Sequence, residues 1–166
     1  VNFLNAQLSA GCILFLFWSI TRLVRGILTD DARKLSTTDV IIILGAGFVG
    51  ALAYTFSDTF WFSAVEGEVY AFSSFLTALV FWMILRWQDE ADSISGDRWI
   101  ILIAYIIGLS IGVHLLNLLC IPAIVLVFYY QKYQAISLKG VIGTIALSGL
   151  LIVLILFVYI PGIADM

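Results

Sequence analysis

Acidic and aromatic side chains gather in one stretch between two apolar runs, residues 57–70. Its acids are Asp58, Glu66 and Glu68, and it contains no Lys or Arg. A carboxylate next to apolar segments costs free energy unless water, a cation or a polar ligand compensates it. Glu66 and Glu68 directly precede an apolar run, and in an extended backbone residues two apart face the same side. This pair is a candidate for holding a divalent metal ion or the hydroxyl groups of a sugar.

Two aromatic residues of the same stretch, Trp61 and Tyr70, can stack on a sugar ring. We therefore include both, with Asp58, among the candidate substrate-binding residues. Structural explanations stay open beside this one. Asp58 also fits a solvated loop, and Glu68 also fits a carboxylate that interacts favourably with the N-terminus of the following helix.

The only histidine, His114, lies in an apolar run with Asn117 three residues further on. A single histidine in such a run is often a packing residue. His114 and Asn117 become candidate binding residues if the chain turns there and places them on the same side as Glu66 and Glu68. No Ser-His-Asp set and no zinc-ligand spacing accompanies them.

The elements that position these residues follow from charge and hydropathy. The chain has 166 residues, 63% hydrophobic and 11% charged, with a mean hydropathy of +1.11. A soluble domain could not bury so much apolar surface, so we predict the lipid bilayer as a partner. The net charge of −3 and the lack of a basic patch argue against a nucleic-acid partner.

All eight Lys and Arg residues fall in three short stretches, at 22–34, 86–98 and 132–139, and the polar breaks between them carry none. This alternation is the positive-inside pattern of a polytopic membrane protein. Both ends of 99–130 carry the basic signal, so that segment must cross an even number of times. We predict two short spans that turn near 114–117, and both chain termini on the non-cytoplasmic side.

The predicted fold is all-α, a single transmembrane domain over 1–166 with about six spans. The expected spans are residues 8–21, 40–56, 69–86, 99–113, 118–130 and 141–160, the last ending at Pro161-Gly162. Residues 36–39 supply N-cap chemistry for the second span. Trp87 and several other aromatic residues at the basic ends of spans are typical of an interfacial belt. The chain starts at Val1 without the basic n-region that a signal peptide would need, so we do not expect residues 1–20 to be one. This start also predicts a piece of a longer chain with at least one span before it.

Gly45, Gly47 and Gly50 fit the dinucleotide pattern G-x-G-x-x-G. That motif requires a strand, a tight turn and a helix. Here the apolar run continues to Phe56, and Gly47, Gly50 and Ala51 give a small-residue face typical of helix contact. Cys12 and Cys120 also lie in apolar runs, and we interpret both as packing residues.

Two stretches, residues 50–71 and 107–117, resemble a family of bacterial membrane proteins frequent in Bacteroidetes. That family is similar to eukaryotic protein O-mannosyltransferases and belongs with the GT-C-fold glycosyltransferases. Residues 2–25 resemble its second membrane span, and the resemblance extends over most of 1–133.

The resemblance implies an enzyme that moves a sugar from a polyprenyl-phosphate carrier to an acceptor protein or glycan. The reaction would take place on the non-cytoplasmic face, the periplasmic side of a bacterial inner membrane. The catalytic carboxylate of such enzymes lies in the first external loop, which would precede Val1, so this fragment alone is expected to be inactive. Glu66 and Glu68 match a second acidic motif that supports acceptor or metal binding, and His114 matches a histidine on the same side.

Two other functions stay open, a transporter or flippase and a non-catalytic membrane scaffold. Transporters favour inverted repeats and ionisable residues at mid-membrane. The expected spans have no charged residue at mid-depth and no evident repeat, so the sequence favours the glycosyltransferase.

Overall fold

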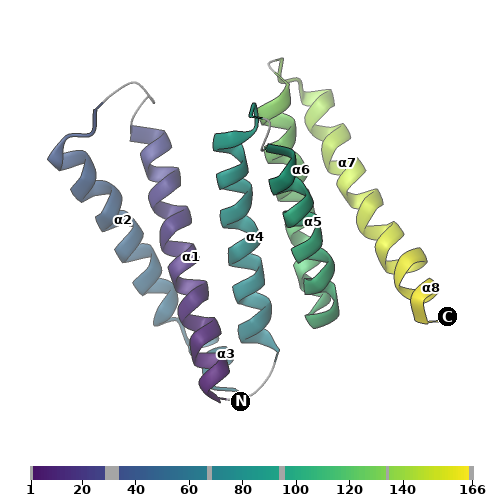
Figure 1. The fold of residues 1–166 in the computed structure, drawn as a ribbon, viewed down its shortest axis with the longest axis horizontal. Helices are drawn as coiled ribbons and strands as arrows, with labels where there is room; N and C mark the ends of the chain where they lie inside the picture. Colours follow the sequence, from purple (N-terminus) through teal and green to yellow (C-terminus); the bar gives the residue numbers. More distant parts are fainter. Residues whose placement is uncertain (1, 29–33, 67–68, 94–95, 134, 165–166) are drawn as a thin grey trace.

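The computed structural model describes residues 2–28, 34–66, 69–93, 96–133 and 135–164. These residues form helices joined by short connections, and none of them forms a strand (Figure 1). In chain order the elements are α1 (Asn2–Leu28), α2 (Thr37–Thr55), α3 (Asp58–Val65), α4 (Tyr70–Glu90), α5 (Gly96–Val113), the 3₁₀-helix η1 (Leu115–Leu119), α6 (Cys120–Lys132), α7 (Leu138–Leu154), the π-helix η2 (Ile155–Tyr159) and α8 (Ile160–Ala164).

Five of the described helical segments are long and apolar enough to cross a membrane. They are Phe3–Leu28, Thr37–Thr55, Tyr70–Glu90, Gly96–Val113 and Leu138–Gly162, and Asn117–Lys132 is a shorter apolar helix. The prediction of an all-α, polytopic helix bundle is therefore confirmed. The spans 99–113 and 118–130 were both expected to be short. Only the second is short, because the first corresponds to α5, which begins at Gly96 and reaches 18 residues.

The first helix is longer at both ends than the expected 8–21, and tertiary contacts explain the difference. Near its start, buried Asn5 donates a hydrogen bond from its side-chain amide to the backbone oxygen of Glu66. Near its end, Arg22 forms an ion pair with Asp89 of α4. Polar residues that hydropathy assigns to the flanks are thus held in the helix by partners far away in the sequence.

The stretch 57–66 is not the loop that the sequence suggested, because it contains α3. Ser57 has an extended backbone before the helix, and Asp58 supplies a carboxylate in the first turn. Phe60 is buried with its ring centroid 4.6 Å from that of Tyr54 in α2. The apolar contact of Phe60 anchors this short helix to the bundle, which local sequence does not reveal.

The helix of the last span does not end at Pro161-Gly162, although the candidate membrane span ends at Gly162. The chain passes through η2 and continues as α8 to Ala164. The helical backbone continues without a break from Leu154 through η2 into α8, so Pro161 lies inside a continuous helix. A proline in a helix interior removes one backbone N–H and crowds the preceding turn, and the wider π-helical turn Ile155–Tyr159 lies directly before α8.

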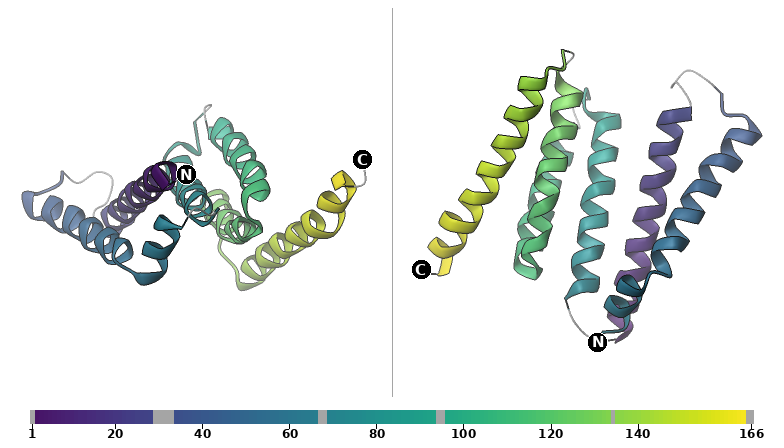
Figure 2. Two further views of the ribbon diagram at one scale, coloured as in Figure 1. Left: turned by 90° about the horizontal axis from the view of Figure 1, so that it is seen from below. Right: turned by 180° about the vertical axis from the view of Figure 1, so that it is seen from behind.

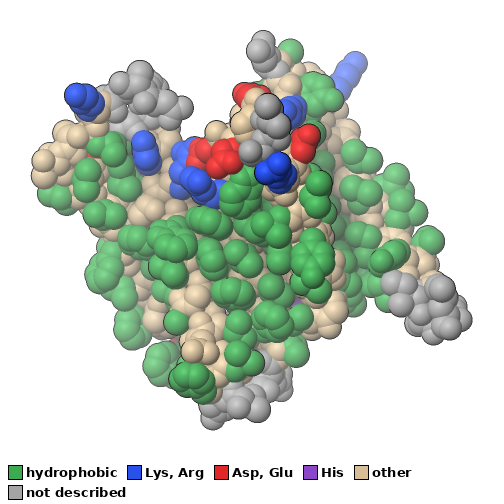
Figure 3. All heavy atoms as spheres, viewed as in Figure 1, with side chains coloured by type: hydrophobic (Ala, Val, Ile, Leu, Met, Phe, Trp, Pro, Cys, Tyr) green, Lys and Arg blue, Asp and Glu red, His purple; other side chains and the backbone are tan. Residues whose placement is uncertain are grey.

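The chain reverses direction after α5, at His114, and returns through η1 and α6 (Figure 1). As a result α1, α4 and α6 finish at one end of the bundle, where α2, α5 and α7 begin. We call this the basic end. The described basic residues belong to it: Arg22, Arg25, Lys34, Arg86, Arg98, Lys132 and Lys139. Figure 3 shows Lys and Arg side chains gathered at this end, above a largely apolar body. The other end, with both termini and α3, is the opposite end.

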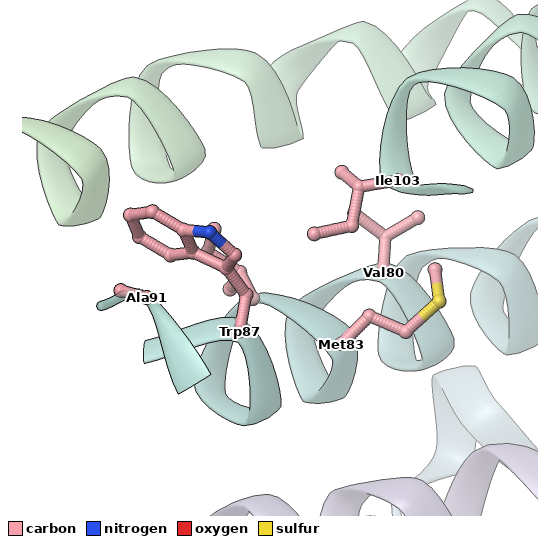
Figure 4. Close-up of a cluster of buried hydrophobic side chains, with 6 residues drawn as sticks. Val80, Met83, Trp87, Ala91 and Ile103 are labelled. Carbon is pink, nitrogen blue, oxygen red and sulfur yellow. The ribbon is translucent and has the colours of Figure 1, made fainter. Parts of the chain in front are cut away.

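Helix α4 is the centre of the bundle, since it packs against α1, α3, α5, α6 and η1. The core cluster includes Val80, Met83, Ile84 and Trp87 of α4 with Ile103 of α5 (Figure 4). Trp87 is 1% exposed, and its ring stacks on Phe128 of α6 at 5.3 Å. The prediction that Trp87 belongs to an interfacial belt is therefore wrong, because the packing of α6 on α4 encloses this ring.

Helices α1 and α2 approach each other through the glycine pattern. A Cβ atom at Gly47 would lie 2.5 Å from Cγ2 of Thr21, and one at Gly50 would lie 2.6 Å from Cδ1 of Ile20. Helix α2 runs unbroken through the pattern, so the strand and turn of a dinucleotide site are absent from Thr37–Thr55. The predicted helix-contact face is confirmed, and Ser36 and Asp39 form the capping box that starts this helix.

The last transmembrane helix lies at the periphery. Helix α7 packs against α6 and continues directly into η2. Figure 2 shows α7 extending away from α1 and α2. The described functional residues predicted from the sequence belong to the part of the bundle formed by α1 to α6.

Candidate functional site at the end opposite the basic residues

Two of the predicted site residues lie on α3. Asp58 is exposed in the first turn of that helix, where a carboxylate interacts favourably with the helix dipole. Trp61 follows on the same helix and is 55% exposed. Since α3 packs against α1, α2 and α4, it fixes Asp58 and Trp61 at the opposite end of the bundle.

Glu66 directly follows α3 and has the extended backbone that the sequence interpretation required, with φ −72° and ψ 137°. Its backbone N–H donates to the oxygen of Phe62 at 2.9 Å, and its backbone oxygen accepts from Asn5. The side chain of Glu66 is exposed. The main chain here is thus fixed from both sides, which leaves the carboxylate at the surface.

Glu68 lies outside the described residues, so the pairing of Glu66 with Glu68 stays a prediction. Across the described parts of the chain, no group of three or more His, Cys, Asp and Glu residues could hold a metal ion. A metal at Glu66 would therefore depend on Glu68 or on ligands from other molecules.

Tyr70 and His114 come together from distant parts of the sequence. Tyr70 is the first residue of α4, and His114 lies at the joint between α5 and η1. The centroids of their rings are 5.5 Å apart, with 50° between the ring planes. The backbone N–H of His114 donates to the oxygen of Ser110 at 2.9 Å, which extends the hydrogen bonding of α5 through this residue. An aromatic ring and an imidazole therefore form one unit at the opposite end.

Asn117 lies one turn beyond His114 and is only 3% exposed. Its side-chain oxygen accepts hydrogen bonds from the hydroxyls of Ser73 at 2.9 Å and Thr77 at 2.7 Å, both in α4. Its amide donates to the backbone oxygen of Ser110 at 3.4 Å. Asn117 thus ties the α5–η1 joint to α4 and fixes the position of the neighbouring His114.

The sequence interpretation missed the partners of Asn117. Ser73 and Thr77 are hydroxyl residues four apart in an apolar run, which places them on one face of a helix. That spacing was the available signal. It does not say which residue the face meets, and only the packing of η1 against α4 brings Asn117 there.

A cavity of about 580 Å³ begins at Asn117 and is lined by residues of α1, α2, α4 and α6. Its wall on α4 runs from Ser73 to Phe81, a rise of about 12 Å along the helix. Apolar atoms form most of the lining, with hydroxyl, amide and thiol groups among them. Both cysteines line it as free thiols. Cys12 is buried and its Sγ contacts the oxygen of Ser74 at 3.4 Å, which fits the predicted packing role.

The predicted residues therefore form two groups. Tyr70, His114 and Asn117 meet where α4 begins and α5 turns into η1. Asp58, Trp61 and Glu66 lie on or just after α3. This arrangement offers aromatic rings, an imidazole and carboxylates beside an apolar cavity, at an end of the bundle without Lys or Arg in the described residues.

Comparison with known protein families gives a match over most of the chain. The model of the family described as Protein O-mannosyl-transferase TMEM260 N-terminal domain covers residues 1–137. The chain belongs to this family. The match includes α1 to α6 and the whole candidate site, and it ends just before α7. No curated protein and no solved structure matches the chain.

Membership confirms the predicted relation to protein O-mannosyltransferases, and with the apolar helices it supports a glycosyltransferase-type function in a membrane. The roles of the individual site residues stay predictions.

Proposed function

We propose that this chain is part of a membrane glycosyltransferase that moves a sugar from a polyprenyl-phosphate carrier to an acceptor hydroxyl. The family description points to mannose as the sugar and a protein as the acceptor. The observation that carries the proposal is the unit of Tyr70, His114 and Asn117 beside an apolar cavity within membrane-spanning helices. That arrangement suits a donor whose sugar is polar and whose carrier is a hydrocarbon.

The reaction forms a bond between the acceptor oxygen and the anomeric carbon of the sugar. It breaks the bond between that carbon and the carrier's phosphate oxygen, which leaves with the electron pair. The acceptor proton goes to a carboxylate that acts as general base. We assign that role to a carboxylate upstream of Val1, with Glu66 and Glu68 binding the acceptor or a divalent metal ion.

His114 is the residue that we assign to the leaving phosphate. The opposite end has no Lys or Arg in the described residues. A hydrogen bond to the phosphate must therefore come from another type of residue. An imidazole N–H can donate to a phosphate oxygen, and such contacts strengthen as charge develops in the transition state. The ring of Tyr70 and the hydrogen bonds of Asn117 restrict where that imidazole can lie.

The cavity below this unit suits part of the carrier's isoprenoid chain. Its volume of about 580 Å³ falls within the range of ligand pockets, about 300–1,000 Å³. Residues such as Ala123 and Ile124 of α6 give it an apolar wall. A chain held there would place its phosphate near the opposite end of α4, next to Tyr70.

The charge pattern supports the sidedness of this proposal. Basic residues mark cytoplasmic loops, so the basic end faces the cytoplasm and the opposite end faces away from it. In a bacterium that face is the periplasmic side of the inner membrane. The same orientation is the one in which GT-C enzymes use lipid-linked sugars, and we place this chain in that fold class.

The proposal is tested with the full-length protein in liposomes, an acceptor peptide rich in Ser and Thr, and radiolabelled mannose on either polyprenyl phosphate or GDP. We expect label on the peptide only from the lipid-linked donor. His114→Gln should reduce transfer by about 10-fold or more. Transfer from GDP-mannose, or an active His114→Gln protein with unchanged kcat and KM, would contradict the respective assignments.

The role of the cavity is tested separately with Ala123→Leu, which narrows it. Ala104→Leu on exposed α5 surface is the matched control, because Ala104 is not part of the cavity lining. We expect Ala123→Leu to raise KM for a long-chain carrier several-fold and to leave a short-chain carrier nearly unaffected. Equal KM changes in the two variants would remove the carrier chain from this cavity.

A further inference from the structure

A second cavity, of about 640 Å³, lies at the basic end and has a polar lining. Arg22 and Arg25 of α1 and Arg86 of α4 contribute three guanidinium groups, and Asp89 and Asp92 contribute two carboxylates. The lining therefore carries one net positive charge, with Arg22 paired with Asp89, and Arg86 paired with Glu90 outside the lining. A positively charged cavity with several arginines suits a phosphate group, because guanidinium groups match phosphate oxygens in geometry and charge.

A third cavity, of about 330 Å³, lies between α1 and α2 and shares Arg22 and Arg25 with the polar one. The rest of its lining is largely apolar, with Trp18 of α1 and Val40, Ile43 and Leu44 of α2 among it. The two arginines thus have a polar space on one side and an apolar crevice on the other. This juxtaposition is what an amphipathic molecule with an anionic head and a hydrocarbon chain requires.

The depth of the site in the membrane fits such a molecule. Trp18 lies one turn before Arg22 on α1, and its ring is 5.8 Å from that of Trp82 on α4. Tryptophan residues concentrate at the level of lipid head groups, so Arg22 and Arg25 lie at or just beyond that level. Basic pockets between transmembrane helices at this level bind anionic lipid head groups.

We propose that Arg22 and Arg25 hold the phosphate of an anionic phospholipid, with one acyl chain of that lipid in the crevice between α1 and α2. This site is at the basic end, away from the sugar-transfer site, and does not depend on the proposed function. Its consequence is structural: the lipid joins α2 to the α1–α4 pair at the basic end, where α2 otherwise meets α1 through the glycine face.

The test uses the full-length protein in detergent, with native mass spectrometry to count bound dioleoyl phosphatidylglycerol or dioleoyl phosphatidylcholine. We expect the wild type to retain phosphatidylglycerol preferentially. Arg22→Gln with Arg25→Gln should weaken that binding about 30-fold, the scale for two basic residues at a membrane surface. The control Arg98→Gln with Lys139→Gln removes equal charge from the same end, outside both cavities. This control should change the affinity for phosphatidylglycerol by less than about 2-fold.

Two further arms separate the parts of the proposal. Leu44→Trp fills the apolar crevice and should reduce lipid retention, whereas Ile41→Trp on the exposed face of α2 should not. Inorganic phosphate at millimolar concentration should not displace the lipid. If the double variant unfolds, Arg25→Gln alone tests the same site and leaves the Arg22–Asp89 pair in place.

Equal losses of phosphatidylglycerol binding in the double variant and in its control would show that general surface charge attracts the lipid. That result would overturn the proposal. Equal binding of the two lipids would do the same. Displacement by inorganic phosphate would assign the arginines to a free anion rather than a lipid.

Discussion

The two ends of the bundle are held together by different kinds of interaction. At the basic end charged groups pair: Arg22 with Asp89, and Arg86 with Glu90 at 3.4 Å. Glu90 also accepts a hydrogen bond from the indole nitrogen of Trp99 at 3.0 Å. At the opposite end, neutral contacts between described residues join the helices: Asn117 is bonded to Ser73 and Thr77, and the Asn5 side chain is bonded to a backbone oxygen.

This difference separates charged residues that hold helices together from charged residues that are available to a substrate. Asp89 and Glu90 of the basic end have arginine partners, so these two acids can serve the assembly of the helices. The opposite end uses neutral buried groups for assembly, and its carboxylates at Asp58 and Glu66 lie at the surface. Residues at the first end should affect stability slightly, and those at the second should affect turnover or the positioning of the site.

The sharpest test of the comparison is which side of the membrane each end faces. In a background of Cys12→Ala and Cys120→Ala, Ser63→Cys on α3 should be labelled by a membrane-impermeant maleimide added outside. Ser137→Cys before α7 should be labelled only after the membrane is opened. The positive-inside rule predicts this all-or-none difference. Labelling of Ser63→Cys from the cytoplasmic side would reverse the orientation and place the candidate site in the cytoplasm.

The largest expected effect on activity comes from Glu68→Gln in the full-length protein. This change keeps shape and hydrogen bonding but removes the charge, and sugar transfer should fall by about 10²-fold or more if Glu68 stabilises charge or binds a metal ion. The measurement is the transfer rate of purified protein, with folding checked by thermal melting.

Glu90→Gln at the basic end is the matched control for that change. It should leave transfer nearly intact and cost at most about 1 kcal/mol of stability, the scale of an exposed ion pair. A well-folded Glu68→Gln protein with near-normal transfer would instead support a helix-dipole role for Glu68, worth under about 1 kcal/mol.

The neutral network is tested with Asn117→Ala. This variant leaves the hydroxyls of Ser73 and Thr77 without their shared acceptor, and we expect a loss of about 1–2 kcal/mol in unfolding free energy. Thr55→Val is the control, because its hydroxyl bonds only within its own helix, to the oxygen of Ala51. Denaturation of both variants in detergent gives the comparison, and equal stabilities would mean that the network does not hold η1 on α4.

The smallest expected effect is the coupling between Arg22 and Asp89, whose side chains are 34% and 28% exposed. A double-mutant cycle with Arg22→Gln and Asp89→Asn should give less than about 1 kcal/mol, decreasing as salt is added. A coupling of several kcal/mol that salt does not reduce would mean that the basic end is held as firmly as a buried core.

Several features of the fold could be predicted from the sequence because they depend on local chemistry. The apolar runs fixed helices, and the capping box at Ser36 and Asp39 fixed the start of α2. The unbroken apolar context around Gly47, Gly50 and Ala51 identified a helix-contact face. The predicted turn at 114–117 falls on the joint where the chain reverses, because basic residues at both ends of 99–130 require an even number of crossings.

Other features depended on which helices meet. Trp87 belongs to the core because α6 covers it, and Ser73 joins the site because Asn117 reaches it from η1. Helix α3 exists because Phe60 has a place to pack. A side chain's type does not record its tertiary partner, so these residues were assigned wrongly or missed.

The sequence by itself determined that the chain forms apolar helices and which of their ends carry the basic residues, since hydropathy and charge report how each segment suits lipid and water. It did not determine the order of packing. The segment Leu138–Gly162 is the most apolar of the five candidate spans, yet only 11% of an 18-residue apolar stretch in it is buried, whereas the corresponding share is 44% for the least apolar, Tyr70–Glu90. Lipid tails already satisfy apolar side chains, so helix association in a membrane depends on close fit and hydrogen bonds. The close fit and the hydrogen bonds exist only when α4, with Ser73, Thr77 and Trp87, packs against its neighbours. Only the tertiary structure decided which helices those neighbours are.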